Sequence, residues 1–164
     1  MSRKVFVFQG DSITDGCWSR NGDPNHILGH GFAFYAAAFL GEAHPDYKFY
    51  NRGISGNTSW EMRQRWDVDA LALHPDVLTV LVGINDCLRQ SKTDCNTKTK
   101  RHSSLEQYEE NIRFCLTETC KQNTNLKVLL GIPFYCRVSG FVENMEFPAD
   151  EKEYDFIRNV RLSA

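Results

Sequence analysis

Four short apolar runs, separated by stretches with helical spacing, constrain the fold of this chain more than any other feature. The runs occupy residues 4–9, 47–53, 76–83 and 126–134 and are rich in β-branched and aromatic residues. Because no hairpin signal joins consecutive runs, each is interpreted as a buried strand of a parallel sheet. With right-handed crossovers, the pattern predicts a flavodoxin-like, three-layer α/β/α sandwich with strand order 2-1-3-4.

Helical patterns between the runs predict the elements that cover the sheet. The first helix should turn one apolar face inward: Phe32, Tyr35, Ala36, Phe39 and Leu40. Gly41 and Pro45 mark its expected end. A second helix is predicted over residues 57–66, where Thr58 and Glu61 have capping-box spacing. A third should start near Ser103, with Glu106 three residues on, and a fourth should cover residues 150–160.

Length and charge narrow the class of protein. The 164 residues suit one domain, residues 1–164, and the net charge of −2 gives no footprint for nucleic acid or for an anionic membrane. No segment approaches the ~18 apolar residues of a membrane span. The apolar run after the start is too short for a signal peptide, so a cytoplasmic location is expected. The six cysteines form no C-x-x-C pair, which predicts buried free thiols and no metal site.

Polar or open-backbone residues follow three of the predicted strands. Ser12 comes just after the first strand, Gly53 after the second and Asn85 after the third. Because the carboxyl ends of parallel strands share one edge of a sheet, these residues should converge there. A serine at such an edge can act as a nucleophile once a base removes its proton. The backbone N–H groups of Ser12 and Gly53 and the side-chain amide of Asn85 could then stabilise an oxyanion.

Three segments around these residues carry a family resemblance. "GDSITDG", "NRGISGNTSWEMRQRW" and "VLVGINDC" resemble the first three conserved blocks of the SGNH/GDSL hydrolases, in the branch of bacterial acetylxylan esterases and related carbohydrate acetylesterases. The resemblance implies a serine esterase that works through an acyl-enzyme on Ser12, with Gly53 and Asn85 in the oxyanion hole. It implies a small-molecule or oligosaccharide ester as substrate, and no cofactor or metal.

The chain departs from the family pattern at the catalytic base. The resemblance implies an Asp-x-x-His block after a fifth strand, yet no Asp-x-x-His occurs in the residues that follow the fourth predicted strand. The chain is therefore expected to be truncated at its C-terminus, with an exposed sheet edge that favours self-association. A short protein that has lost catalysis is the alternative. Among the five histidines, His26 and His30 lie in sequence closest to Ser12 and are the first candidates for a substitute base.

Other residues at the same edge leave further possibilities open. Asp11, Asp15 and Asp86 could indicate a glycoside hydrolase or a Mg²⁺ site, although Asp11 and Asp86 are better interpreted as braces that bind backbone N–H groups. Trp18 is a candidate sugar platform, whereas Trp66 has the helical spacing of a core residue.

Three rival functions follow from these residues. One is a binding protein that uses the same cleft without catalysis. Another is a lipase or thioesterase that cleaves longer acyl groups. A phosphoryl-transfer or nucleotide-binding domain is disfavoured, because no G-x-x-x-x-G-K-[ST] or G-x-G-x-x-G follows the first strand.

Overall fold

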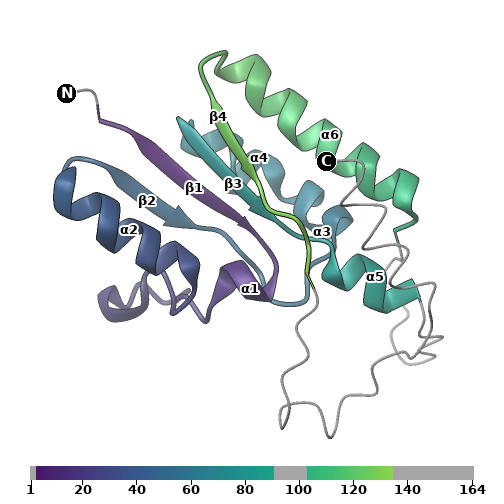
Figure 1. Ribbon diagram of the computed structural model, residues 1–164, viewed down its shortest axis with the longest axis horizontal. Coiled ribbons are helices and arrows are strands. Elements are labelled where there is room, and N and C mark those ends of the chain that lie inside the picture. Colours follow the sequence, from purple (N-terminus) through teal and green to yellow (C-terminus); the bar gives the residue numbers. More distant parts are fainter. Residues whose placement is uncertain (1–2, 91–102, 135–164) are drawn as a thin grey trace, which may run out of the picture.

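A four-stranded parallel sheet with helices on both faces forms the described part of the chain (Figure 1). The computed structural model describes residues 3–90 and 103–134. In chain order the elements are β1 (Val5–Gly10), α1 (Ser12–Asp15), η1 (Pro24–His26), α2 (Phe32–Ala43), β2 (Lys48–Asn51), α3 (Ser59–Gln64), α4 (Trp66–Asp69), η2 (Leu71–Leu73), β3 (Val77–Leu81), α5 (Ile84–Gln90), α6 (Leu105–Gln122) and β4 (Lys127–Leu130). The strand order β2-β1-β3-β4 confirms the predicted fold class and topology. The expected fifth strand and the predicted helix over 150–160 lie outside the described residues.

One face of the sheet packs against α3, α4 and α6. The core cluster on this face contains Val7, Met62, Trp66, Ala70, Leu78, Val80, Val82, Cys87, Tyr108, Ile112 and Cys115. Trp66 is fully buried, as predicted, and its Nε1–H donates to Thr119 Oγ1 at 3.0 Å. Because a buried indole N–H without a partner is costly, this hydrogen bond allows the largest core side chain to sit between α4 and α6.

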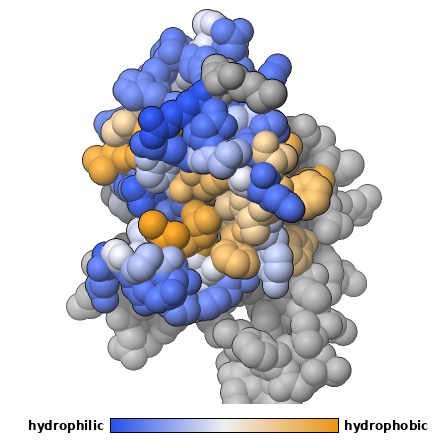
Figure 2. All heavy atoms as spheres, turned by 90° about the vertical axis from the view of Figure 1, so that its left-hand side faces the viewer, coloured by the Kyte–Doolittle hydropathy of each residue, from blue (hydrophilic) through white to orange (hydrophobic). Residues whose placement is uncertain are grey.

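The other face of the sheet packs against α2, through Phe32 as predicted but not through Tyr35 and Phe39. Ala33 and Ala37 are the buried residues of this helix, whereas Tyr35 is 69% and Phe39 78% exposed. The strands already fill the interface with aromatic rings, and Phe8 meets Phe32 at 5.8 Å between ring centroids. Ala33 and Ala37 therefore face the sheet, and the rings of Tyr35 and Phe39 face outward. Apolar atoms accordingly gather between hydrophilic regions on the side that carries α2 and β2 (Figure 2).

Helix boundaries agree with the sequence patterns at some positions and differ at others. Thr58 and Glu61 form the predicted capping box, but the helix breaks at Arg65, where α3 ends and α4 begins. The third predicted helix is α6, and its cap is Ser104 with Gln107, one residue later than expected. A short helix, α5, follows β3, and the sequence patterns did not predict it. α2 ends at Ala43, between the predicted end markers Gly41 and Pro45.

Two further sequence expectations concern thiols and membranes. Cys87 and Cys115 are buried and free as predicted, while Cys17 and Cys120 are free but exposed. Among the helices of residues 3–90 and 103–134, none combines the length and the apolar character that crossing a membrane requires.

Candidate active site

Ser12 is presented at the surface by a tight exit from β1. It is the first residue of α1, and Asp11 caps that helix by accepting the Ile13 N–H at 3.1 Å through Oδ1. Gly10 has φ +155°, and a Cβ there would lie 2.1 Å from the Leu81 carbonyl oxygen. The Asp11 N–H donates to that same oxygen at 3.3 Å. The turn that carries Ser12 is therefore tied to the end of β3.

Gly53 lies at the same edge, after β2, but its amide is already used. Its N–H donates to Asn51 Oδ1 at 2.9 Å, and an added Cβ would lie 2.4 Å from the Asp15 nitrogen. Asn51 is buried, and its Nδ2 donates to the Thr14 carbonyl oxygen at 2.7 Å. This hydrogen bond leaves no Gly53 N–H for an oxyanion, which corrects the prediction for this residue. A glycine is required here because the loop packs tightly against α1.

Asn85 lies after β3, at the start of α5, and its amide is held by the loop after β2. Its Nδ2 donates to the Asn57 carbonyl oxygen at 3.0 Å. The same loop is tied to β1, because the Ile54 N–H donates to the Gly10 carbonyl oxygen at 3.0 Å. An amide nitrogen carries two hydrogens, so one of those on Asn85 has no partner among residues 3–90 and 103–134. The loop after β2 thus contacts both Asn85 and Gly10, which precedes Ser12 by two residues.

Asp86 anchors the beginning of α5 to α3. It is fully buried, its Oδ1 accepts the Ser59 hydroxyl at 2.6 Å, and its Oδ2 accepts the Ser59 N–H at 2.9 Å. The Asn111 side chain donates to the same hydroxyl oxygen at 3.1 Å. Burial raises the pKa of Asp86, and the hydrogen bonds from Ser59 oppose that shift. These contacts hold the residue next to Asn85 in a defined place, and they confirm Asp86 as a brace.

Asp11 and Asp15 are also braces, with different partners. Burial raises the pKa of Asp11 to about 6, the N–H of Ile13 opposes the shift, and the charge of Asp86 adds to it. Asp11 Oδ2 has no hydrogen-bond partner among the described residues. Asp15 Oδ2 pairs with Arg20 Nη2 at 2.7 Å and also accepts the Ser55 N–H at 2.7 Å. Within residues 3–90 and 103–134, no group of three or more His, Cys, Asp or Glu side chains is arranged to hold a metal ion.

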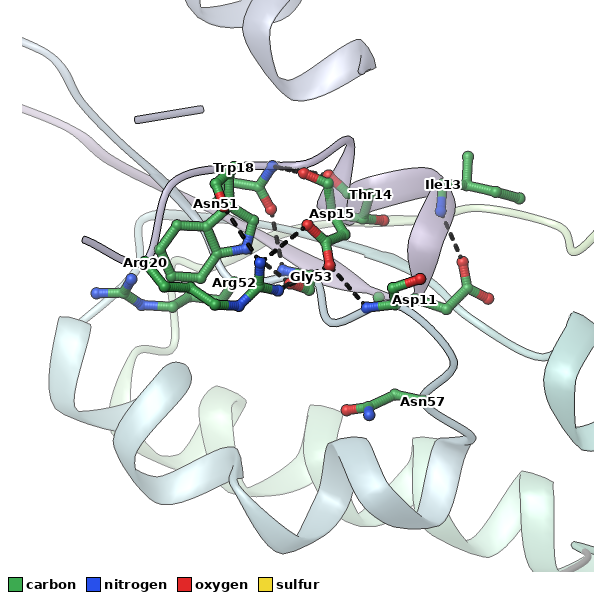
Figure 3. A network of polar contacts seen from close by, with 12 residues as sticks. Asp11, Ile13, Thr14, Asp15, Trp18, Arg20, Asn51, Arg52, Gly53 and Asn57 are labelled. Atoms are coloured by element: carbon green, nitrogen blue, oxygen red, sulfur yellow. Dashed lines mark hydrogen bonds and ion pairs between the residues drawn. The ribbon is translucent and has the colours of Figure 1, made fainter. Parts of the chain in front are cut away.

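Trp18 packs beside Gly53 (Figure 3). Its Nε1–H donates to the Gly53 carbonyl oxygen at 2.7 Å. The guanidinium of Arg20 lies 4.7 Å, and that of Arg52 5.5 Å, from the ring centroid. Because cations already occupy the space over this ring, the structure favours a bracing role for Trp18 over that of a sugar platform.

No base for Ser12 is found among the described residues. The Ser12 hydroxyl makes no hydrogen bond within residues 3–90 and 103–134. His26 and His30 contact each other edge to face, with ring centroids 4.9 Å apart. The His30 N–H donates to the Gly16 carbonyl oxygen at 2.7 Å, which places its backbone beyond the C-terminal end of α1. The role of either histidine as a substitute base therefore stays a prediction without a supporting contact.

An apolar cavity lies outside the Ser12 site. Its volume is about 240 Å³, and it lies between α6 and the residues that follow β4. Tyr108, Ile112, Leu130 and Pro133 are among its lining residues, whereas Ser12 is not. This cavity therefore gives no support to a long acyl chain bound at the serine.

Three residues that the sequence patterns did not single out connect the site. Asn51 is hydrogen-bonded to the turn after Ser12 and to the Gly53 N–H. Asn57 accepts a hydrogen bond from the Asn85 side chain. Arg65 Nε donates to Asn57 Oδ1 at 2.9 Å. The one signal that could have found them is a polar residue at a position expected to be buried. Arg65, for example, directly precedes the buried Trp66.

Comparisons with known proteins agree with this geometry. The model of the GDSL-like Lipase/Acylhydrolase family matches residues 8–160. The sequence is similar to an acetylxylan esterase from Geobacillus stearothermophilus, with 34% identity over 138 residues, which cover 82% of this chain. The chain spans 61% of the length of that curated relative.

Solved structures show the same likeness. The acetylxylan esterase Axe2 from Geobacillus stearothermophilus aligns with a TM-score of 0.74 and 31% identity, covering 98% of this chain and 71% of that one. A putative GDSL-like lipase from Parabacteroides merdae aligns with a TM-score of 0.71 and 32% identity, covering 99% of this chain and 76% of that one.

Proposed function

This chain belongs to the GDSL-like lipase/acylhydrolase family, and we propose that it serves to hydrolyse carboxylic esters at Ser12, removing an acetyl group from a carbohydrate or another small ester. The observation that carries the proposal is the meeting of the Ser12 turn, the loop after β2 and Asn85 at one edge of the sheet. The acetylated carbohydrate is suggested by the acetylxylan esterases to which the chain is similar.

The reaction follows from the chemistry of these groups. Ser12 Oγ bonds to the ester carbonyl carbon while its proton passes to a base, and the carbonyl electron pair moves onto oxygen. The free hydrogen of Asn85 Nδ2 and the Ser12 N–H stabilise that oxyanion. The alcohol leaves with a proton, and water then releases acetate and restores the Ser12 hydroxyl.

The base is the component that decides the rate. No Asp-x-x-His follows β4 in this sequence, and the described residues place no base at Ser12. Without a base, serine hydrolases retain roughly 10³–10⁴-fold catalysis over water, from the oxyanion donors and binding. We therefore expect slow turnover and slow labelling by a fluorophosphonate from the 164-residue chain.

Supplied imidazole tests the proposal with the chain as it is. Acetate release from an acetylated xylo-oligosaccharide is measured with increasing imidazole, and Ser12→Ala is measured in parallel to subtract the reaction of imidazole itself. We expect an imidazole-dependent rate that Ser12→Ala abolishes. Asn85→Ala should lower that rate by roughly 10²–10³-fold. The exposed Asn125 lies in the turn before β4, away from the site edge, so Asn125→Ala is the matched control and should change nothing. Equal rates from the wild-type chain and Ser12→Ala would contradict the proposal.

A non-catalytic binding protein is the second candidate, because the described residues place no base at Ser12. It predicts that calorimetry detects binding of the acetylated oligosaccharide, with equal affinity in the wild-type chain and in Ser12→Ala. It also predicts that imidazole adds no serine-dependent turnover.

A further inference from the structure

Arg65 contacts the ends of β1 and β2 and the loop after β2, at the edge of the sheet that carries Ser12. Its Nη2 donates to the Gly10 carbonyl oxygen at 3.3 Å, at the end of β1. Its Nη1 donates to the Arg52 carbonyl oxygen at 2.7 Å, just after β2, and to Gln9 Oε1 at 3.0 Å. Its Nε donates to Asn57 Oδ1 at 2.9 Å. One planar guanidinium therefore sets the relative positions of two strand ends and a loop.

The charge of Arg65 is balanced within the same cluster. Its side chain is only 16% exposed, and its Nη1 lies 2.9 Å from Asp69 Oδ2. Asp69 also accepts the Gln9 side-chain amide at 2.8 Å through its carbonyl oxygen. A paired and hydrogen-bonded guanidinium can remain charged at this depth, whereas an unpaired one could not. The cluster is thus built to keep Arg65 in place.

Asn57 transmits this position to Asn85. Its side-chain oxygen accepts from Arg65, and its main-chain oxygen accepts from Asn85 Nδ2 at 3.0 Å. Because both acceptors belong to one residue, a shift of the Asn57 side chain moves the oxygen that orients the Asn85 amide. Oxyanion donors work only within a narrow range of distances, about 2.7–3.1 Å, so a small shift is costly.

We propose that Arg65 is a positioning residue for ester hydrolysis, which aims the Asn85 amide through Asn57 without touching the substrate. This inference rests on the proposed function, because it takes Asn85 to be an oxyanion donor. It adds a requirement for a forked cation at position 65. A lysine there keeps the charge, but as a point donor it cannot contact Gly10, Arg52 and Asn57 together.

The first measurement is independent of activity. The ¹⁵N–¹H signal of the Asn85 side-chain amide is assigned by its loss in Asn85→Ala, and then followed in Arg65→Lys. We expect the two amide protons to move toward the shifts of a free side-chain amide. The exposed Arg113, which pairs with Glu109 on α6, provides the control, and Arg113→Lys should leave the signal unchanged. An unchanged signal in folded Arg65→Lys overturns the inference.

The second measurement uses the imidazole-dependent, serine-dependent rate. Arg65→Lys should lower kcat by about 10–100-fold with KM unchanged. A general loss of folded protein would instead lower the amount of active enzyme in proportion to the lost circular dichroism signal. If the amide signal moves and the rate does not, the role of Asn85 in the proposed function is wrong while the positioning stands. If Arg65→Lys does not fold, Asn57→Ala removes the acceptor of Arg65 Nε alone, and an unchanged Asn85 signal there overturns the inference.

Discussion

Asp11→Asn should stabilise the fold at neutral pH and leave its stability almost unchanged in acid. Asp11 is 1% exposed, its Oδ2 lacks a partner among the described residues, and its pKa rises from 3.8 to about 6 on folding. At about 1.4 kcal/mol per pKa unit, ionising this carboxyl costs the folded state up to ~3 kcal/mol. The penalty is absent below pH 3.8, grows between pH 3.8 and 6, and is complete above pH 6. Asparagine carries no charge and can still accept the Ile13 N–H, so the helix cap is kept.

The assay is urea unfolding followed by circular dichroism at pH 4.5 and pH 7.5. The quantity compared is the change in unfolding free energy between the two pH values, because pH-independent effects of the substitution cancel in it. We expect the wild-type chain to lose about 2 kcal/mol more than Asp11→Asn between pH 4.5 and 7.5. The exposed Asp67 provides the control, and Asp67→Asn should follow the wild-type chain. Identical pH dependence in the wild-type chain and Asp11→Asn would refute the reasoning that burial raises the pKa of Asp11.

Three further substitutions test packing and capping through the same unfolding measurement. Gly53→Ala places a Cβ 2.4 Å from the Asp15 nitrogen, so we expect at least ~2 kcal/mol of destabilisation, and a wild-type midpoint would contradict that close approach. Trp66→Phe removes the donor to Thr119 Oγ1 and leaves a gap in the core, so the free energy of unfolding should fall by about 2–4 kcal/mol. A fall below ~0.5 kcal/mol would show that the hydrogen bond contributes nothing. Thr58→Ala removes the cap of α3 and should cost about 0.5–2 kcal/mol, whereas no change in thermal midpoint would exclude a stabilising cap.

Local patterns in the sequence were sufficient for the features that depend on local chemistry. The alternation of apolar runs and helical stretches gave the strand order, and the spacing of Thr58 and Glu61 gave the capping box of α3. Ser12 was placed correctly because a strand must end where polar turn residues begin. Each of these features depends on residues within one or two turns of one another.

The features that were missed depend on residues far apart in the sequence. Tyr35 and Phe39 have helical spacing with apolar neighbours, yet they are exposed because the aromatic rings of the strands already fill the space under α2. Gly53 was expected to offer its N–H, but Asn51 takes it, and that asparagine is positioned by Thr14 across 37 residues of chain. No periodicity within a segment reports such a contact.

The central place of β1 in the sheet determines when a growing chain can assemble the Ser12 region. β1 is made first, yet it pairs with β2 on one side and β3 on the other, with Phe6 opposite Phe49 and Val77. On a ribosome, one edge of β1 therefore stays without its partner until β3 has emerged. Pairings across such distances in sequence fold slowly and leave strand edges open to other chains in the meantime. The bond from the Asp11 N–H to Leu81 joins the first strand to the last residue of β3. The serine next to Asp11 thus reaches its final setting only after the chain has been made through Leu81.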